Sequence, residues 1–186
     1  MKKLQYNSPV ILSFFFLSLL ALLLGHLTKG WSTAALFSVY RAPLTDPLTY
    51  VRLLGHVLGH ADGSHFLGNM LLLLVVGPPL EEKYGSRTLL IGILLTAGVS
   101  GILQCVFFPG SALLGASGIV FMLIMLASLA GMKDGRIPLT LILAAVLYLG
   151  QEVYAMVALR DNVANFMHLV GGVTGTVFGV VLAKRR

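Results

Sequence analysis

The chain has little charge and a single cysteine. Only 11% of its 186 residues are charged and 57% are hydrophobic, whereas about a quarter of the residues of a typical soluble domain carry charge. A soluble domain and a disordered chain are both excluded, because neither combines so little charge with so much apolar side chain. Cys105 has no partner cysteine, so a disulfide scaffold is excluded as well.

Long apolar runs fill most of the sequence. Short polar breaks separate six of them, over residues 9–27, 65–80, 88–108, 113–131, 137–158 and 163–183. Each is close to the length of about 20 residues that crosses a bilayer core. The sequence therefore predicts an all-α, polytopic membrane protein with six transmembrane helices in one domain, residues 1–186. Residues 28–64 are too polar to span and too apolar for a free linker, so we expect them to be membrane-associated.

The basic residues set the expected orientation. The formal net charge is +6, and Lys and Arg are retained on the cytoplasmic side of membranes. A cytoplasmic N-terminus puts nine basic residues inside and four outside: Lys2, Lys3, Lys83, Arg87, Lys133, Arg136, Lys184, Arg185 and Arg186 against Lys29, Arg41, Arg52 and Arg160. Both termini are then cytoplasmic. The charge indicates attraction to the lipid bilayer and no nucleic-acid partner, which would need basic residues clustered with stacking aromatics.

Four polar side chains inside the predicted spans share one layer. The second, fourth and sixth spans all run from outside to inside, so His65, Asn69, Ser117 and His168 each lie roughly 10 Å or less below the outer boundary. A serine hydroxyl becomes nucleophilic when a neutral imidazole accepts its proton, which makes His168 the candidate base for Ser117. His65 and Asn69, one turn apart, can donate to an oxyanion. No carboxylate is placed to orient His168, so a dyad is expected.

Glycines mark two further features. Gly115 and Gly118 flank Ser117 and leave the backbone bare, so that a peptide can approach closely. Another set recurs every four residues and predicts a close contact between helices: Gly171, Gly175 and Gly179.

Each polar residue also has a structural alternative. A serine in a membrane helix is usually a packing residue, His65 could be interfacial, and Asn69 could join two helices. His26, His56 and His60 are expected at the surface or in loops. The spacing of His56 and His60 could make a metal pair, but no cysteine or carboxylate completes a set, so no metal is predicted.

Three motifs follow in a set order: His56-x3-His60-x4-His65-x3-Asn69, then Gly115-Ala116-Ser117-Gly118, then His168-x2-Gly171-x3-Gly175. With the six spans and the long first loop, they resemble the rhomboid family of intramembrane serine proteases over nearly the whole chain. The resemblance implies that Ser117 is the nucleophile and that His168 is the general base and then the acid. It also implies that His65 and Asn69 stabilise the oxyanion.

The resemblance further implies a cofactor-free protease whose substrates are single-span transmembrane proteins. It specifies no oligomeric state, and we expect the protein in the inner (plasma) membrane of a bacterium.

Two positions depart from the family pattern. Phe121 stands where a tyrosine is frequent, and Val51-Arg52 replaces a Trp-Arg pair. The alternative is a non-catalytic rhomboid-like protein that binds unstable membrane helices for quality control, and a histidine-based metal carrier is a third hypothesis.

Overall fold

Long apolar helices make up most of the computed structural model, which describes residues 5–130, 136, 139–144, 146–147 and 162–184. Within these residues, three helices are long and apolar enough to cross a bilayer: α1 (Pro9–Leu27), α4 (Gly63–Tyr84) and α5 (Ser86–Phe107). The helices α6 (Ser117–Ala130) and α9 (Asn162–Lys184) are also apolar. The all-α membrane architecture predicted from the sequence is confirmed.

The helix bounds agree only partly with the predicted spans. Helix α1 has the predicted bounds, but α4 continues through Pro78 and Pro79 and ends at Gly85, where φ is +82°. Membrane helices tolerate prolines because neighbouring groups satisfy the backbone that they disturb. The predicted fifth span, 137–158, lies mostly outside the described residues, which include the short helix α7 (Leu139–Ala144). The count of six spans stays a prediction.

The fourth span starts later than predicted. Leu113 and Val39 form an isolated β-bridge, with N–H···O distances of 2.8 and 2.9 Å, and the Gly115 N–H donates to the carbonyl oxygen of His56 at 3.0 Å. These bonds, and a φ of +127° at Gly115, hold the segment out of the helical conformation. Helix α6 therefore begins at Ser117, four residues after the predicted start of the span at residue 113.

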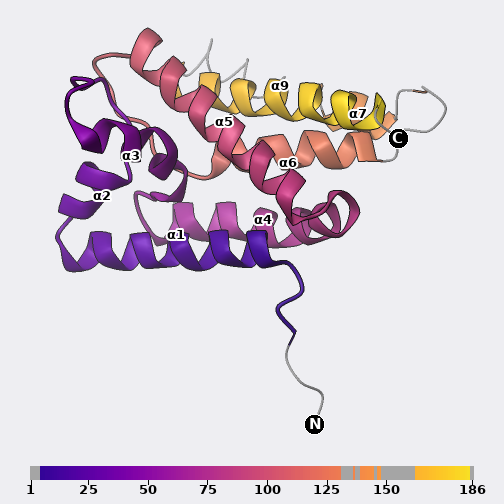
Figure 1. Ribbon diagram of the computed structural model, residues 1–186, viewed down its shortest axis with the longest axis horizontal. Coiled ribbons are helices and arrows are strands. Elements are labelled where there is room, and N and C mark those ends of the chain that lie inside the picture. The colour runs from indigo at the N-terminus through magenta and orange to yellow at the C-terminus, as the bar shows by residue number, and fades with distance from the viewer. Residues whose placement is uncertain (1–4, 131–135, 137–138, 145, 148–161, 185–186) are drawn as a thin grey trace.

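The helices form two neighbouring pairs, α1 with α4 and α6 with α9, and α5 crosses obliquely over both pairs (Figure 1). Helices α4, α6 and α9 all begin at the end of the molecule where α2 (Trp31–Leu36) and α3 (Pro47–Gly55) lie (Figure 1). This end carries the candidate site. The core between the pairs is aliphatic and includes Ile11, Met70, Leu73, Leu89, Ile119 and Leu123.

Helices α6 and α9 pack backbone to backbone. A Cβ atom on Gly171 would lie 2.2 Å from the carbonyl oxygen of Gly118, and one on Gly175 would lie 2.4 Å from that of Met122. A Cβ atom on Gly179 would lie 2.5 Å from Cδ1 of Leu129 on α6. The close contact predicted from these three glycines is confirmed. The two helices run parallel, because residue numbers rise together along the contact.

One buried arginine holds the first long loop, residues 28–64. The Arg52 guanidinium pairs with Asp46 and donates from Nη1 to the Tyr40 hydroxyl at 3.0 Å and to the Ala35 carbonyl at 3.3 Å. It also lies 4.6 Å from the centre of the Tyr40 ring, within cation–π range. The hydrogen bond from Arg52 lowers the pKa of the Asp46 carboxyl. The loop is anchored although no tryptophan precedes the arginine.

A buried carboxylate joins α1 to α4. Glu81 accepts the N–H groups of Val10 at 2.9 Å and Ile11 at 3.0 Å, and it also accepts the Ser86 hydroxyl at 2.7 Å. The first N–H groups of a helix have no acceptor within that helix, and negative charge is favourable at this end of its dipole. Glu81 therefore caps α1 from a neighbouring helix.

Candidate active site

Ser117 is the first residue of α6, directly after the turn at Gly115. The Val120 N–H donates to the carbonyl oxygen of Ala116 at 2.9 Å, which starts the helical hydrogen-bond series. The N–H groups before that bond have no acceptor within the helix, and the helix dipole adds positive charge there. The Ser117 hydroxyl therefore lies beside backbone donors that can stabilise a developing oxyanion.

His65 approaches Ser117 across Gly115. A Cβ atom on Gly115 would lie 2.9 Å from His65 Cε1, 3.0 Å from His65 Nε2 and 3.9 Å from Ser117 Oγ. The Ala61 N–H donates a long hydrogen bond of 3.5 Å to His65 Nδ1. With Nδ1 as the acceptor, the neutral ring carries its proton on Nε2. The Nε2–H donor of His65 and the hydroxyl of Ser117 therefore both lie close to the Cβ position of Gly115.

Asn69 lies one turn after His65 on α4 and is buried. Its Nδ2 donates one hydrogen to the His65 carbonyl oxygen at 3.0 Å. A side-chain amide has a second N–H, so Asn69 retains a donor that a ligand can use.

His168 lies on α9, and its ring stacks on the ring of Phe121. The ring centroids are 4.6 Å apart and the planes differ by 7°. Phe121 follows Ser117 by one turn on α6, and helical side chains lean toward the N-terminus, which carries the phenyl ring back toward the serine. Phe121 therefore supplies an aromatic contact to His168 although the position lacks the hydroxyl of a tyrosine.

The register of the two helices places His168 beside the start of α6. Gly171 faces Gly118, and His168 lies three residues before Gly171. In two parallel helices, moving back by the same number of residues on each reaches the same level. His168 therefore lies level with the turn that leads into Ser117.

His56 and His60 lie in the first loop, as one of the two expected positions, but their side chains are buried and not at the surface. The 3-10 turn η1 (His56–Leu58) packs against α5, where His56 Nε2 lies 3.2 Å from Ser100 Oγ. Burial lowers the pKa of each imidazole to about 4. His26 is exposed, as predicted. Among the described residues, no group of three or more His, Cys, Asp or Glu side chains is arranged to hold a metal ion.

Asp62 contacts the site and was not singled out from the sequence. Its Oδ1 accepts the His65 N–H at 2.8 Å and the Ser64 hydroxyl at 2.6 Å, so it is the N-cap of α4. Aspartate is a preferred N-cap. An aspartate three residues before a candidate donor, at the start of an apolar run, was a signal available in the sequence.

Comparison with known proteins identifies the family. Residues 47–185 match the Rhomboid domain. The chain is 34% identical over 143 residues to Rhomboid-related protein 1 of Caenorhabditis elegans, covering 70% of this chain and 39% of that protein. It is 35% identical over 145 residues to RHOMBOID-like protein 2 of Arabidopsis thaliana, covering 72% and 43%. The chain spans less than half the length of these relatives. With its apolar helices and its match to this domain over most of its length, the chain is an integral membrane protein of the rhomboid family.

Proposed function

We propose that the protein is an intramembrane serine endopeptidase that hydrolyses peptide bonds in or near the transmembrane segments of membrane proteins. One observation carries the proposal. Ser117 Oγ and His65 Nε2 lie 3.9 and 3.0 Å from a single point at Gly115, and His168 is stacked on Phe121 beside the same turn. In this proposal, the nucleophile comes from α6, the base from α9 and an oxyanion donor from α4, and all three belong to one end of the bundle.

Acylation begins when Ser117 Oγ attacks the scissile carbonyl carbon and its proton passes to a ring nitrogen of His168. The carbonyl oxygen becomes an oxyanion, which accepts hydrogen bonds from His65 Nε2, from Asn69 Nδ2 and from the first N–H groups of α6. His168 then gives the proton to the amine nitrogen as the C–N bond breaks. The product is an acyl-enzyme on Ser117.

Deacylation repeats the sequence with water as the nucleophile. Water gives a proton to His168 and attacks the acyl carbon, and Ser117 leaves with that proton. Stacking on Phe121 holds the imidazole plane, a task that a carboxylate performs in a triad. No step of this mechanism requires a cofactor.

The proposal includes the setting of the enzyme. The chain forms one domain with six crossings, both termini are cytoplasmic, and the membrane is the inner membrane of a bacterium. Because α4, α6 and α9 begin at one end (Figure 1), the site opens near the outer face. Single-span membrane proteins whose helix unwinds near that face are the substrates, since an intact helix hides its carbonyl groups.

Labelling with a serine-reactive fluorophosphonate in detergent tests the proposal. We expect the wild type to be labelled and Ser117→Ala to lose labelling. Ser128→Ala is the matched control, because Ser128 lies in the same helix and donates to the Ile124 carbonyl oxygen at 2.9 Å; it should label normally. His168→Ala should lose more than roughly a thousandfold in the rate of cleavage of a tagged single-span protein, because the two residues act as a unit.

Two results would reject the enzyme. Labelling that persists in Ser117→Ala removes the nucleophile. A wild type that binds a single-span protein but neither cleaves it nor reacts with the probe is instead a non-catalytic member of the family.

A further inference from the structure

His65 donates usefully only if its ring presents Nε2–H, rather than Nδ1, toward Ser117. A neutral imidazole has two tautomers, and the hydrogen bond at one nitrogen selects where the proton lies. Here the Ala61 N–H donates to Nδ1 at 3.5 Å, and Nε2 lies on the side of Gly115. The Ala61 amide therefore selects the tautomer that can serve the reaction.

The amide of Ala61 reaches the ring because the chain bends at Ala61 and Asp62, directly before α4. Asp62 is extended, with φ −157° and ψ 178°, and its side chain accepts the His65 N–H at 2.8 Å. The Ser64 hydroxyl donates to the same oxygen at 2.6 Å, and this hydrogen bond is the main cause that lowers the pKa of the Asp62 carboxyl. The carboxylate therefore ties the residue before α4 to the backbone of His65.

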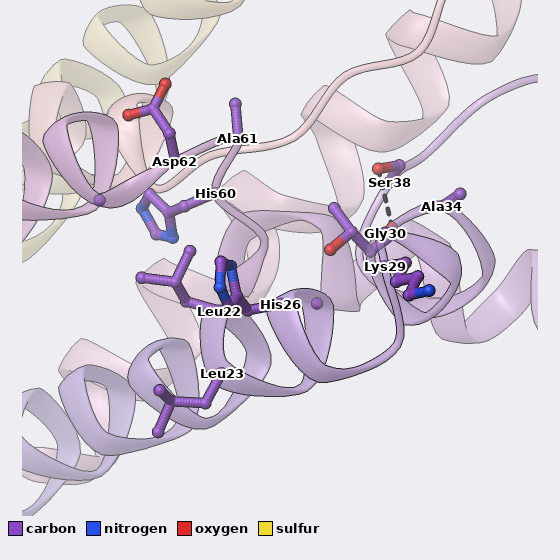
Figure 2. A pocket seen from close by; sticks show the side chains of 13 residues that line it. Leu22, Leu23, His26, Lys29, Gly30, Ala34, Ser38, His60, Ala61 and Asp62 are labelled. Atoms are coloured by element: carbon purple, nitrogen blue, oxygen red, sulfur yellow. Dashed lines mark hydrogen bonds between the residues drawn. The ribbon is translucent and has the colours of Figure 1, made fainter.

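Contacts between aromatic rings support this turn on one side. The His60 ring lies 5.1 Å from the His65 ring and 5.4 Å from the Phe66 ring, centre to centre. On the other side, residues 60–63 border a cavity of about 950 Å³ against the end of α1. Figure 2 shows the Asp62 carboxylate pointing away from that cavity. The hydrogen bonds of Asp62 thus help to hold the turn in place beside this cavity.

We propose that Asp62 is a positioning residue for the oxyanion donor His65, an inference that rests on the proposed function. Without its carboxylate, the turn relaxes and the Ala61 N–H leaves Nδ1. The ring then populates both tautomers and more than one orientation, and only part of the protein presents Nε2–H to the oxyanion. An N-cap with a merely structural role would affect the stability of α4 and leave the turnover of the folded enzyme unchanged.

Steady-state cleavage of a tagged single-span protein separates these roles. Asp62→Ala should lower kcat roughly tenfold to a hundredfold with little change in KM, since His65 acts on the oxyanion and not on the bound substrate. Asp62→Ser keeps a capping oxygen and should recover most of the activity. Rates are expressed per folded enzyme, from thermal unfolding of each variant. A wild-type kcat in Asp62→Ala, or an Asp62→Ser variant as slow as Asp62→Ala, overturns the proposal.

A measurement that needs no activity completes the test. The chain has five histidines, so ¹⁵N-histidine NMR in detergent can resolve the imidazole of His65, assigned by the loss of its signals in His65→Gln. We expect a single Nε2–H tautomer in the wild type and in Asp62→Ser, and a mixture in Asp62→Ala. A pure Nε2–H tautomer in Asp62→Ala overturns the positioning role. Failure of Ser117 to react overturns the protease alone, and the tautomer result still decides the role of Asp62.

Discussion

At the scale of single residues, Gly115 decides how closely the site can assemble. Its φ of +127° is a conformation that L side chains rarely adopt, and the space where a side chain would stand is bordered by His65 and Ser117. A glycine at this position thus permits the backbone turn into α6 and leaves room for the His65 imidazole.

The variant Gly115→Ala tests this role. The added methyl group would lie 2.9 Å from His65 Cε1, so the ring must move, and we expect kcat/KM to fall by roughly a hundredfold. The control is Gly110→Ala, since nothing lies within 4 Å of its Cβ position. Cleavage assays on both proteins give the comparison. Equal losses in the two variants would mean that the loop, and not the contact with His65, sets the rate.

At the scale of elements, the parallel pair α6 and α9 carries Ser117 and His168, the two residues proposed to react. The register of the pair depends on backbone contact at Gly171 and Gly175. Small residues allow such contacts in membrane helices. We therefore expect the stability of the protein and the proposed activity to be coupled at this interface.

Replacement of Gly171 by alanine should reduce both properties. Its Cβ would lie 2.2 Å from the Gly118 carbonyl oxygen, which forces the helices apart and moves His168 relative to Ser117. We expect the free energy of unfolding to fall by roughly 1–3 kcal/mol, together with slower fluorophosphonate labelling. Gly68→Ala in α4 is the control, because its Cβ would meet nothing within 4 Å. Unchanged unfolding of Gly171→Ala in detergent would contradict the assigned contact.

At the scale of the whole molecule, buried histidines connect the first loop to the helices. His56 bonds to α5 through Ser100, and burial lowers its pKa to about 4 from the ordinary value of 6.5. Burial also lowers the pKa of His60 to about 4. Protons therefore bind the unfolded chain at a higher pH than they bind the folded protein.

This difference predicts an acid-sensitive stability. The contribution of His56 is fully present above pH 6.5 and is lost as the pH falls toward 4, by up to roughly 3 kcal/mol. The pKa values of Asp46 and Asp62 are lowered below 3.8. Protonation of these carboxylates therefore reduces stability only at still lower pH. Over this pH range, the melting temperature of His56→Gln should fall less steeply with decreasing pH than that of the wild type. The exposed His26 supplies the control, His26→Gln, which should keep the wild-type slope.

Much of the fold was predictable because hydrophobicity acts locally along the chain. The bounds of α1 follow from an uninterrupted apolar run, and the glycine spacing on α9 indicates its contact face. The start of α6 was not predictable in this way, since the Leu113–Val39 bridge joins residues far apart in sequence. The end of α4 was missed because Pro78 and Pro79 are tolerated in an apolar bundle.

The residue types of the candidate site were also visible in the sequence, but not their surroundings. The burial of His56 and His60 depends on how η1 packs against other helices, and no local pattern records that packing. Asp62 was overlooked although an N-cap can be recognised from local sequence. Its effect on the His65 ring depends on the bend at residues 61 and 62, which brings the Ala61 N–H to that ring.

The sequence alone determined that this is an all-α membrane protein and which side chains are able to do chemistry, because transfer into a bilayer depends on composition and reactivity depends on residue type. Only the tertiary structure decided that Ser117 opens its helix, which edge of the His65 ring faces it, and that Phe121 holds His168. These features depend on directional hydrogen bonds and close contacts between distant parts of the chain, and such interactions exist only after the helices have packed.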